Sequence, residues 1–223
     1  MISLQGINKY YITGDEKIHA LRDVDLEIKK GEFIAVMGPS GSGKSTMIKI
    51  LGLLDNNFQG EYFFDGKNVR TLNDDQLSTI RNNKIGFVFQ NFNLIKTLTI
   101  KENIYLPMLY KGASKKQCQE RALSLLRRVD LESKTNKYVS ELSGGQQQRV
   151  AIIRALVNNP DIIIADEPTG ALDSHTSKDI MNLFQELNKE GITIIVITHD
   201  KDVAKEAKRI VNIFDGELKE DAV

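Results

Sequence analysis

Three short stretches of the sequence are continuously apolar or β-branched: Phe33 to Met37, Ile162 to Ile164 and Ile192 to Thr198. A strand that is covered on one face alternates apolar and polar residues, whereas a strand buried on both faces does not. The last two stretches flank a helix-like segment from Ser177 to Glu190, and neighbouring parallel strands need such a crossover. The sequence therefore predicts an α/β fold built on a parallel sheet that is covered on both faces.

Two further portions of the chain have different patterns. Apolar and acidic residues alternate from 24 to 28, which predicts a half-buried strand, and residues 61–64 lead into an Asp-Gly turn typical of a hairpin. Residues 85–89 form another short β-rich run. From Thr99 to about Leu131 the apolar spacing is helical, with one break at Lys111-Gly112. This middle stretch predicts a helical subdomain inserted into the α/β core.

Charge and composition narrow the possible functions. Thirty Lys and Arg residues balance thirty Asp and Glu residues, which argues against binding of bulk nucleic acid through a basic face. Cys118 is the single cysteine, so no intrachain disulfide can form, and a reducing compartment fits. The longest apolar run is too short to span a membrane, and Met1 to Gln5 lack the pattern of a signal peptide. We expect a soluble, cytoplasmic protein that reaches a membrane only through a partner.

A glycine-rich segment, Gly38 to Ser45, matches the phosphate-loop pattern G-x-x-x-x-G-K-[ST]. It follows one predicted strand and precedes a helix, which is the context that the motif requires. Its glycines let backbone N–H groups point at an anion, and the start of the helix adds a positive pole. Lys44 supplies a full charge for the β- and γ-phosphates, and the Ser45 hydroxyl can bind Mg²⁺. The alternative, a glycine-rich turn with an incidental lysine, is disfavoured by this context.

Two carboxylates, Asp166 and Glu167, end the apolar stretch that begins at Ile162. The carboxyl end of a parallel strand is where α/β sheets bind ligands. Asp166 can hold Mg²⁺ through water as the acidic partner of the phosphate loop. Glu167 faces the other way and could polarise an attacking water. The alternative role for such a pair is to cap the following helix.

A second helix start suited to an anion lies at Ser143-Gly144-Gly145, just ahead of an apolar helix from Val150 to Val157. Ser143 would be its hydroxyl donor. One nucleotide does not need two such sites from one subunit. The alternative interpretation is a well-capped helix.

The segment Leu142 to Gln146 resembles the signature motif of ATP-binding-cassette (ABC) ATPases, and the resemblance covers essentially the whole chain. It implies that Gln90 is the Q-loop glutamine, a Mg²⁺ ligand and relay to a membrane partner. Asp173 resembles the D-loop aspartate. His199 resembles the switch histidine that senses the γ-phosphate, although a lone histidine in this position would more often be structural.

The resemblance also implies an aromatic side chain that stacks on adenine. Tyr11 is the residue that matches, and Tyr10 next to it would face the opposite side of a strand. The choice between the two tyrosines stays open at this point.

Together the motifs and the resemblance give three groups of expected site residues, with ATP and Mg²⁺ as the ligands. The catalytic group is Glu167, His199 and Lys44, and the Mg²⁺ ligands are Ser45, Gln90 and Asp166. The residues expected to contact ATP are Tyr11, Gly38, Ser40, Gly41, Ser42, Gly43, Lys44, Ser45, Thr46, Gln90, Ser143, Gly144, Gly145, Gln146, Asp173 and His199.

The resemblance further implies an architecture and an assembly. A phosphate-loop ATPase core with an N-terminal antiparallel β portion would comprise about residues 1–90 and 158–223, and a helical subdomain about residues 91–157. Two copies would pack head to tail, with each ATP between residues 38–45 of one copy and residues 143–146 of the other. Hydrolysis would drive a separate transmembrane permease from the cytoplasmic face of a bacterial membrane.

A narrower resemblance points to the macrolide-export and lipoprotein-extraction branch of the family. The matching segments are residues 84–95, Glu102-Asn103 with Leu106-Pro107, and residues 166–173. Members of this branch pair a free-standing ATPase with a four-helix permease. Because the permease contacts the cargo, drug, lipoprotein and peptide transport stay open.

Two other functions are possible for such a sequence. One is a soluble cassette ATPase that acts on DNA or ribosomes. DNA-repair members carry a long coiled coil between the Q-loop and the signature motif, where this chain has only residues 91–141, and ribosome-acting members usually carry two cassettes. The other is a regulatory module that does not hydrolyse ATP, which the intact Glu167 and His199 disfavour.

Overall fold

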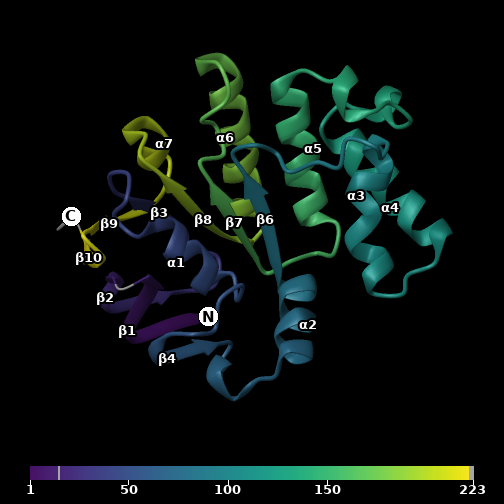
Figure 1. Ribbon diagram of the computed structural model, residues 1–223. Coiled ribbons are helices and arrows are strands. Elements are labelled where there is room, and N and C mark those ends of the chain that lie inside the picture. The colour runs from purple at the N-terminus through teal and green to yellow at the C-terminus, as the bar shows by residue number, and fades with distance from the viewer. Residues whose placement is uncertain (15, 221–223) are drawn as a thin grey trace.

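Two sheets organise the chain in the computed structural model, which describes residues 1–14 and 16–220 (Figure 1). The larger sheet has the strand order β10-β9-β3-β8-β7-β6, and the smaller has the order β2-β1-β4-β5. The larger sheet comprises β3 (Phe33–Met37), β6 (Ile85–Phe89), β7 (Ile162–Asp166), β8 (Thr193–Thr198), β9 (Arg209–Phe214) and β10 (Glu217–Glu220). The smaller comprises β1 (Ile2–Thr13), β2 (Glu16–Ile28), β4 (Gln59–Phe64) and β5 (Lys67–Asn68).

The larger sheet is parallel except for its edge strand β10, which runs antiparallel to β9. Alternate residues of its central strands enter two different apolar clusters. Ile195 packs in the cluster shared with the smaller sheet, whereas its neighbours Ile194 and Val196 pack in the cluster on the opposite face. Both faces are therefore covered, which confirms the prediction from the unalternating stretches.

Helix α1 lies between the two sheets, and most of the other helices cover the opposite face of the larger sheet (Figure 1). Met47 and Ile50 of α1 are fully buried against that shared core. The α-helices are α1 (Lys44–Leu51), α2 (Asp74–Lys84), α3 (Ile100–Tyr110), α4 (Lys115–Arg128), α5 (Gly144–Leu156), α6 (Ser174–Lys189) and α7 (Lys201–Lys205). Single 3₁₀ turns are η1 (Val69–Thr71), η2 (Glu132–Lys134) and η3 (Val139–Glu141).

The predicted helical stretch is confirmed as α3 and α4, which are separated at Lys111-Gly112 as expected. Gly112 has a φ of +76°, a conformation that favours glycine and ends the helix. The helix start predicted at Ser143-Gly144-Gly145 is confirmed, because α5 begins at Gly144 and Ser143 caps it. Among the described residues, no helix combines the length and apolar character that a membrane span requires.

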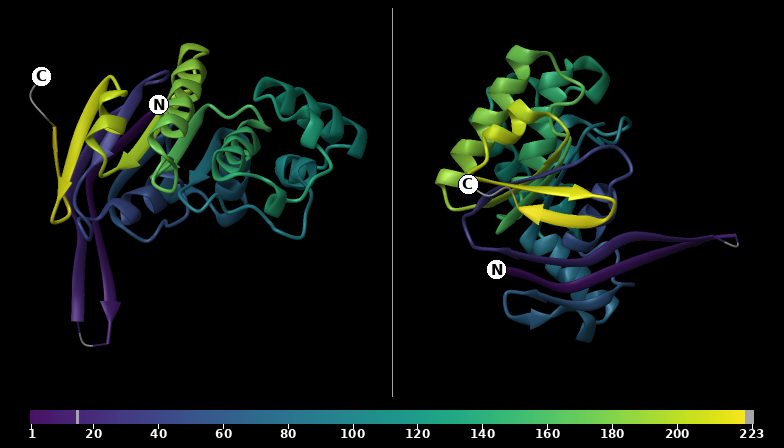
Figure 2. Two further views of the ribbon diagram at one scale, coloured as in Figure 1. Left: turned by 90° about the horizontal axis from the view of Figure 1, so that it is seen from above. Right: turned by 90° about the vertical axis from the view of Figure 1, so that its left-hand side faces the viewer.

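The smaller sheet carries a long hairpin. Strands β1 and β2 pair antiparallel from Ile2↔Ile28 to Thr13↔Glu16, and their far ends project beyond the rest of the molecule (Figure 2). Ile12 and Ile18, near the far end, are largely exposed. Ala20 and Leu21 of β2 lie against Gly43 in the turn that precedes α1, so this part of the hairpin is close to the candidate site.

Candidate functional site

Four loops that carry predicted site residues meet at one edge of the parallel sheet. Each follows the carboxyl end of a strand: β3 leads into Gly38, β6 into Gln90, β7 into Glu167 and β8 into His199. The strand register aligns these ends, since Phe89 pairs with Asp166 and Met37 with Thr198. This is the edge at which parallel α/β sheets bind ligands.

The phosphate loop, residues 38–45, is tightly packed. A Cβ on Gly38 would lie 2.3 Å from the Ile213 carbonyl oxygen, so only glycine fits there. Gly43 has a φ of +111°, and the Gly216 N–H donates a 3.0 Å hydrogen bond to the Ser42 carbonyl. The Ser42 hydroxyl is buried and has no hydrogen-bond partner among the described residues. A buried unpaired hydroxyl in a loop of this kind suits an anionic ligand.

Lys44 is folded over this loop at the start of α1. Its ammonium group donates 2.7 Å hydrogen bonds to the carbonyl oxygens of Gly38 and Pro39. Ser45 is exposed beside it, and Thr46 is buried. The first-turn N–H groups of a helix have no partners within the helix, and they carry its positive pole. The start of α1 therefore has the charge and donors to bind phosphate.

Asp166 and Glu167 have different surroundings. Burial, together with the charge of Glu167, raises the pKa of Asp166, while Lys44 acts in the opposite direction. Glu167 has a φ of +44°, and its N–H donates a 2.8 Å hydrogen bond to the Ile197 carbonyl. Neither carboxylate caps the next helix, because Asp173 is the N-cap of α6.

The side chain of Glu167 is held by the residues that follow β8. One carboxylate oxygen accepts a 3.0 Å hydrogen bond from the backbone N–H of His199. The same oxygen lies 2.6 Å from the ring nitrogen Nδ1 of His199. The other accepts a 2.9 Å hydrogen bond from the Thr198 hydroxyl. The structure thus brings together the predicted base and the predicted switch histidine, an arrangement in which one group orients the other.

Gln90 lies against the turn that contains Glu167. A Cβ on Gly170 would be 2.7 Å from Gln90 Nε2. Phe92 and Asn93, in the loop after Gln90, have φ values of +61° and +47°. Their carbonyl oxygens accept hydrogen bonds of 2.9 Å and 2.5 Å from the guanidinium of Arg154 on α5. No sequence motif marks Arg154, since its spacing indicates only a helix.

Replacing Arg154 with methionine is expected to lower the free energy of unfolding by about 2–3 kcal/mol, because hydrogen bonds from a charged group to two carbonyls are lost. Urea unfolding would measure this change. The matched control is Arg149→Met on the same helix, which breaks a partly exposed 3.2 Å ion pair with Asp179 and should cost less than about 1 kcal/mol. Equal losses in the two variants would contradict the expectation.

The signature segment, Ser143 to Gln146, starts α5 with a reciprocal cap. The Ser143 hydroxyl accepts from the Gln146 N–H at 3.4 Å, and the Ser143 N–H donates to the Gln146 side chain at 3.2 Å. Lys134, which the motif analysis missed, donates to the same side-chain oxygen at 3.0 Å. A Cβ on Gly145 would lie 2.4 Å from the Thr176 methyl group, next to the cap residue Asp173. The capped-helix interpretation therefore holds for this chain, and it leaves other roles of Ser143 open.

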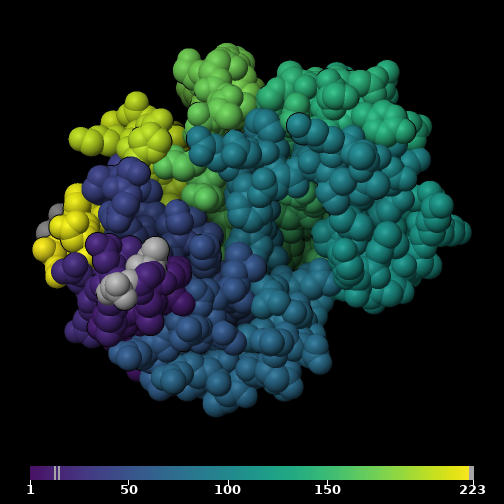
Figure 3. All heavy atoms as spheres, in the orientation of Figure 1, coloured from purple at the N-terminus to yellow at the C-terminus, as the bar shows by residue number. Residues whose placement is uncertain are grey.

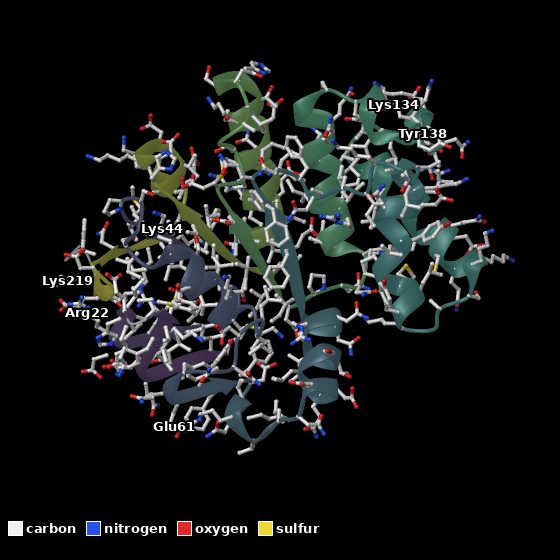
Figure 4. All side chains as sticks on the ribbon, viewed as in Figure 1. Arg22, Lys44, Glu61, Lys134, Tyr138 and Lys219 are labelled. Carbon is white, nitrogen blue, oxygen red and sulfur yellow. The ribbon has the colours of Figure 1, made fainter. Side chains whose placement is uncertain are left out.

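The two helix starts suited to anions are far apart within one chain. Strands β8, β7 and β6 separate α1 from α5 (Figure 1). Lys44, at the first helix start, and Lys134, beside the second, lie on opposite sides of the molecule (Figure 4). The two predicted anion sites therefore do not adjoin within one copy.

The two tyrosines of β1 have different neighbours. The ring of Tyr10 stacks on His19 with 4.1 Å between ring centroids, whereas the hydroxyl of Tyr11 is buried. The opposite strand of the hairpin lies against the phosphate loop, because a Cβ on Gly43 would be 2.6 Å from the Ala20 carbonyl, and Tyr10 pairs with the neighbouring residue His19. The assignment of the adenine contact to Tyr11 stays a prediction.

Residues 21–170 match the protein family described as "ABC transporter". The chain belongs to the ABC transporter family. As an ABC ATPase it binds and hydrolyses ATP, and the family resemblance and fold class drawn from the sequence are confirmed.

Relatives in this family differ in length. The chain is 47% identical over 221 residues to the "Macrolide export ATP-binding/permease protein MacB" of Mannheimia succiniciproducens, with 99% of the chain and 34% of the relative covered. It is 53% identical over 223 residues to the "Uncharacterized ABC transporter ATP-binding protein MJ0796" of Methanocaldococcus jannaschii, with 98% and 95% covered. The chain thus spans about a third of the macrolide export protein and nearly all of MJ0796.

Solved structures of ABC cassettes share the fold. One, described as "Dimeric Structure of MJ0796, a Bacterial ABC Transporter Cassette", has a TM-score of 0.90 and 50% identity, with 99% of this chain and 98% of that chain covered. Another is described as a dimeric post-hydrolysis state of MJ0796 "bound to ADP and Pi" and has a TM-score of 0.90 at 49% identity, with the same coverage. These likenesses confirm the parallel-sheet ABC ATPase fold.

Proposed function

We propose that this chain is the nucleotide-binding subunit of a transporter of the macrolide-export type and drives a separate membrane permease. One observation supports ATP hydrolysis most directly. The phosphate loop, the acidic pair Asp166 and Glu167, and His199 lie together at one edge of the parallel sheet. The name of the macrolide export relative includes a permease, whereas MJ0796 is a cassette of about this chain's length. On the likeness to MJ0796 we propose a permease on a separate polypeptide, and the chain would work at the cytoplasmic face of the membrane that holds it.

In the proposed reaction, residues 38–46 hold the phosphates of ATP through backbone N–H groups and the Lys44 ammonium. Glu167 aligns the attacking water on the γ-phosphate and takes up its proton. The hydrogen bonds from Thr198 and His199 fix the Glu167 carboxylate in place for this role. His199, which contacts the same carboxylate, would respond to the γ-phosphate that this water attacks.

The donor atoms at this edge also fit Mg²⁺. Mg²⁺ prefers hard oxygen ligands. This edge offers three of them: the Ser45 hydroxyl, the Asp166 carboxylate and the Gln90 amide oxygen. Asp166 is near enough to Lys44 for the lysine charge to affect its pKa. We propose that these three residues hold Mg²⁺, which would neutralise charge on the β- and γ-phosphates. Among the described residues, no group of three or more His, Cys, Asp or Glu is arranged to hold a metal ion.

The placement of the two helix starts on opposite sides of the molecule (Figure 4) supports a nucleotide shared by two copies. In this assembly, the signature segment of one copy would close over ATP held by the other. It would do so through Ser143, Gly144, Gly145 and Gln146. Asp173 would lie at the same interface, because its cap partner Thr176 contacts Gly145. The MJ0796 structures, described as dimeric, are consistent with this assembly.

The permease would dock beside a helical subdomain of residues 91–157. A groove of about 990 Å³ lies between β6 and α3 (Figure 3), and its lining includes Leu54, Phe87 and Tyr110. Leu54 and Tyr110 are exposed apolar side chains, and Arg154 lines the same groove. A cytoplasmic segment of the permease seated here would be linked through Arg154 to the loop after Gln90.

The proposed function can be tested by phosphate release and by association. The purified chain should release phosphate from ATP, and it should copurify with the membrane protein encoded by the neighbouring reading frame, for which four spanning helices are expected. Absence of phosphate release would favour the regulatory module. Stimulation by DNA or ribosomes, without copurification of a membrane protein, would favour the soluble alternative.

The adenine contact gives a further expected result. Tyr11→Ala should weaken ATP binding by about 1–3 kcal/mol, the range for aromatic stacking on a base. The rate at saturating ATP should be largely unchanged, because adenine does not change during hydrolysis. Binding calorimetry and steady-state kinetics would measure the two effects. An effect of Tyr10→Ala without an effect of Tyr11→Ala would reassign the contact to Tyr10.

A further inference from the structure

The ammonium group of Lys9, on strand β1 of the hairpin, is buried against the segment that follows α1. The Lys9 side chain on β1 is only 4% exposed, and its Nζ forms a 2.6 Å ion pair with Asp55. The same Nζ donates a 2.6 Å hydrogen bond to the Asn57 carbonyl oxygen. Both acceptors belong to the segment that follows α1. The position of the Lys9 charge is therefore fixed by the far end of the helix that begins at Lys44.

The same ammonium also contacts an aromatic ring. Its Nζ lies 5.0 Å from the ring centroid of Tyr11, two residues further along β1. This distance is within the range of a cation–π interaction, which strengthens when the cation is shielded from water. The Tyr11 hydroxyl is buried without a hydrogen-bond partner among the described residues. Packing and the Lys9 charge, rather than a hydrogen bond, thus set the position of this ring.

We propose that Lys9 is a positioning residue for nucleotide binding, which holds the Tyr11 ring so that its other face stacks on adenine. This inference rests on the proposed adenine contact of Tyr11. Asp55 and Asn57 follow α1. The ion pair therefore also connects the tyrosine that would contact adenine to the helix that would contact the phosphates. Lys9 would in this way fix the spacing between the two ends of the nucleotide site.

The neighbouring tyrosine provides a matched control. Lys17 places its Nζ 4.0 Å from the ring centroid of Tyr10, and Tyr10 stacks on His19. Lys17 is exposed on the hairpin. The same kind of contact is therefore present on both tyrosines, but only Lys9 is buried and anchored to the segment after α1.

The test compares a ligand that has a base with one that lacks it. Binding of ADP and of pyrophosphate is measured by calorimetry for the unchanged chain, Lys9→Met and Lys17→Met. Lys9→Met should weaken ADP binding about 3- to 10-fold, the scale of a cation–π contact of intermediate burial. Pyrophosphate binding should stay the same, and Lys17→Met should change neither. Lys9→Arg should restore most of the ADP affinity, since a guanidinium keeps the charge and stacks on aromatic rings.

Each departure from this pattern has a distinct meaning. Equal weakening of ADP and pyrophosphate by Lys9→Met would show a merely structural role and overturn the proposal, as would an effect confined to Lys17→Met. Tyr11→Ala is run in parallel: if it spares ADP binding, the adenine contact itself is wrong. If Tyr11→Ala weakens ADP selectively and Lys9→Met does not, only the Lys9 inference fails. Should Lys9→Met not fold, Asp55→Asn, which frees the ammonium without removing it, must still weaken ADP selectively.

Discussion

Replacing Lys44 with alanine is expected to abolish ATP hydrolysis and to weaken nucleotide binding. The ammonium of Lys44 is the cationic group folded over the phosphate loop, where it already binds two loop carbonyls. Without it, the charge that builds up on the transferred phosphate loses its main side-chain partner. The rate of phosphate release should fall by at least about 100-fold, the scale for removal of one preorganised electrostatic donor.

Lys49→Ala provides the control for this variant. Lys49 is an exposed lysine of the same helix, one turn and a residue beyond Lys44, so its loss changes helix composition and net charge equally. It should keep the activity of the unchanged chain to within about twofold, as a surface substitution does. Circular dichroism would show that both variants fold. Activity of Lys44→Ala within twofold of the unchanged chain would refute the assignment of the phosphate loop.

Replacing Glu167 with glutamine is expected to stop hydrolysis and to accumulate an ATP-bound dimer. Glutamine keeps the shape and an oxygen that can accept from the His199 N–H, but it cannot act as a base. It also removes one negative charge near the triphosphate. If ATP lies between two copies, its binding free energy becomes association free energy. The unchanged chain would hydrolyse its ATP and separate, whereas the variant would stay assembled.

Size-exclusion chromatography with and without ATP would measure this dimer. The shift to a dimer should require both ATP and Glu167→Gln. Adding Ser143→Arg, which obstructs the signature segment, should return the variant to a monomer. Glu190→Gln, at an exposed glutamate paired with Arg128, should behave like the unchanged chain. A Glu167→Gln protein that stays monomeric at millimolar ATP, with binding shown separately, would count against a shared nucleotide.

The parts of the fold that could be predicted from sequence are those fixed by neighbours in the chain. The continuous apolar stretches identify the buried strands because the period of side chains along a strand is local. The phosphate loop is predicted from residue types at a fixed spacing, although the contact that requires glycine at position 38 is with the distant Ile213. The start of the helix after Ser143 is predicted in the same way: two glycines have low helix propensity, but Ser143 followed three residues later by Gln146 is a capping pattern that compensates for it.

Other site features depend on contacts between distant segments, which residue type and spacing do not encode. Arg154 reads as one more basic residue of a helix, although it binds the loop after Gln90. Gln148 reads as a third consecutive glutamine, but it is fully buried and its amide donates to the Pro168 carbonyl. Lys9 is of a residue type that is usually exposed, yet its side chain is buried and paired with Asp55.

The cap at Ser143 means that one side chain can serve two partners at once. A hydroxyl group accepts through its lone pairs and donates through its single proton. As the helix cap, the Ser143 oxygen accepts from the Gln146 N–H, so its own proton remains available. The cap also restricts rotation of the side chain before any anion arrives, which removes part of the entropy cost of binding. The feature that makes α5 stable in a single chain is therefore also the one that would preorganise it to receive phosphate from outside.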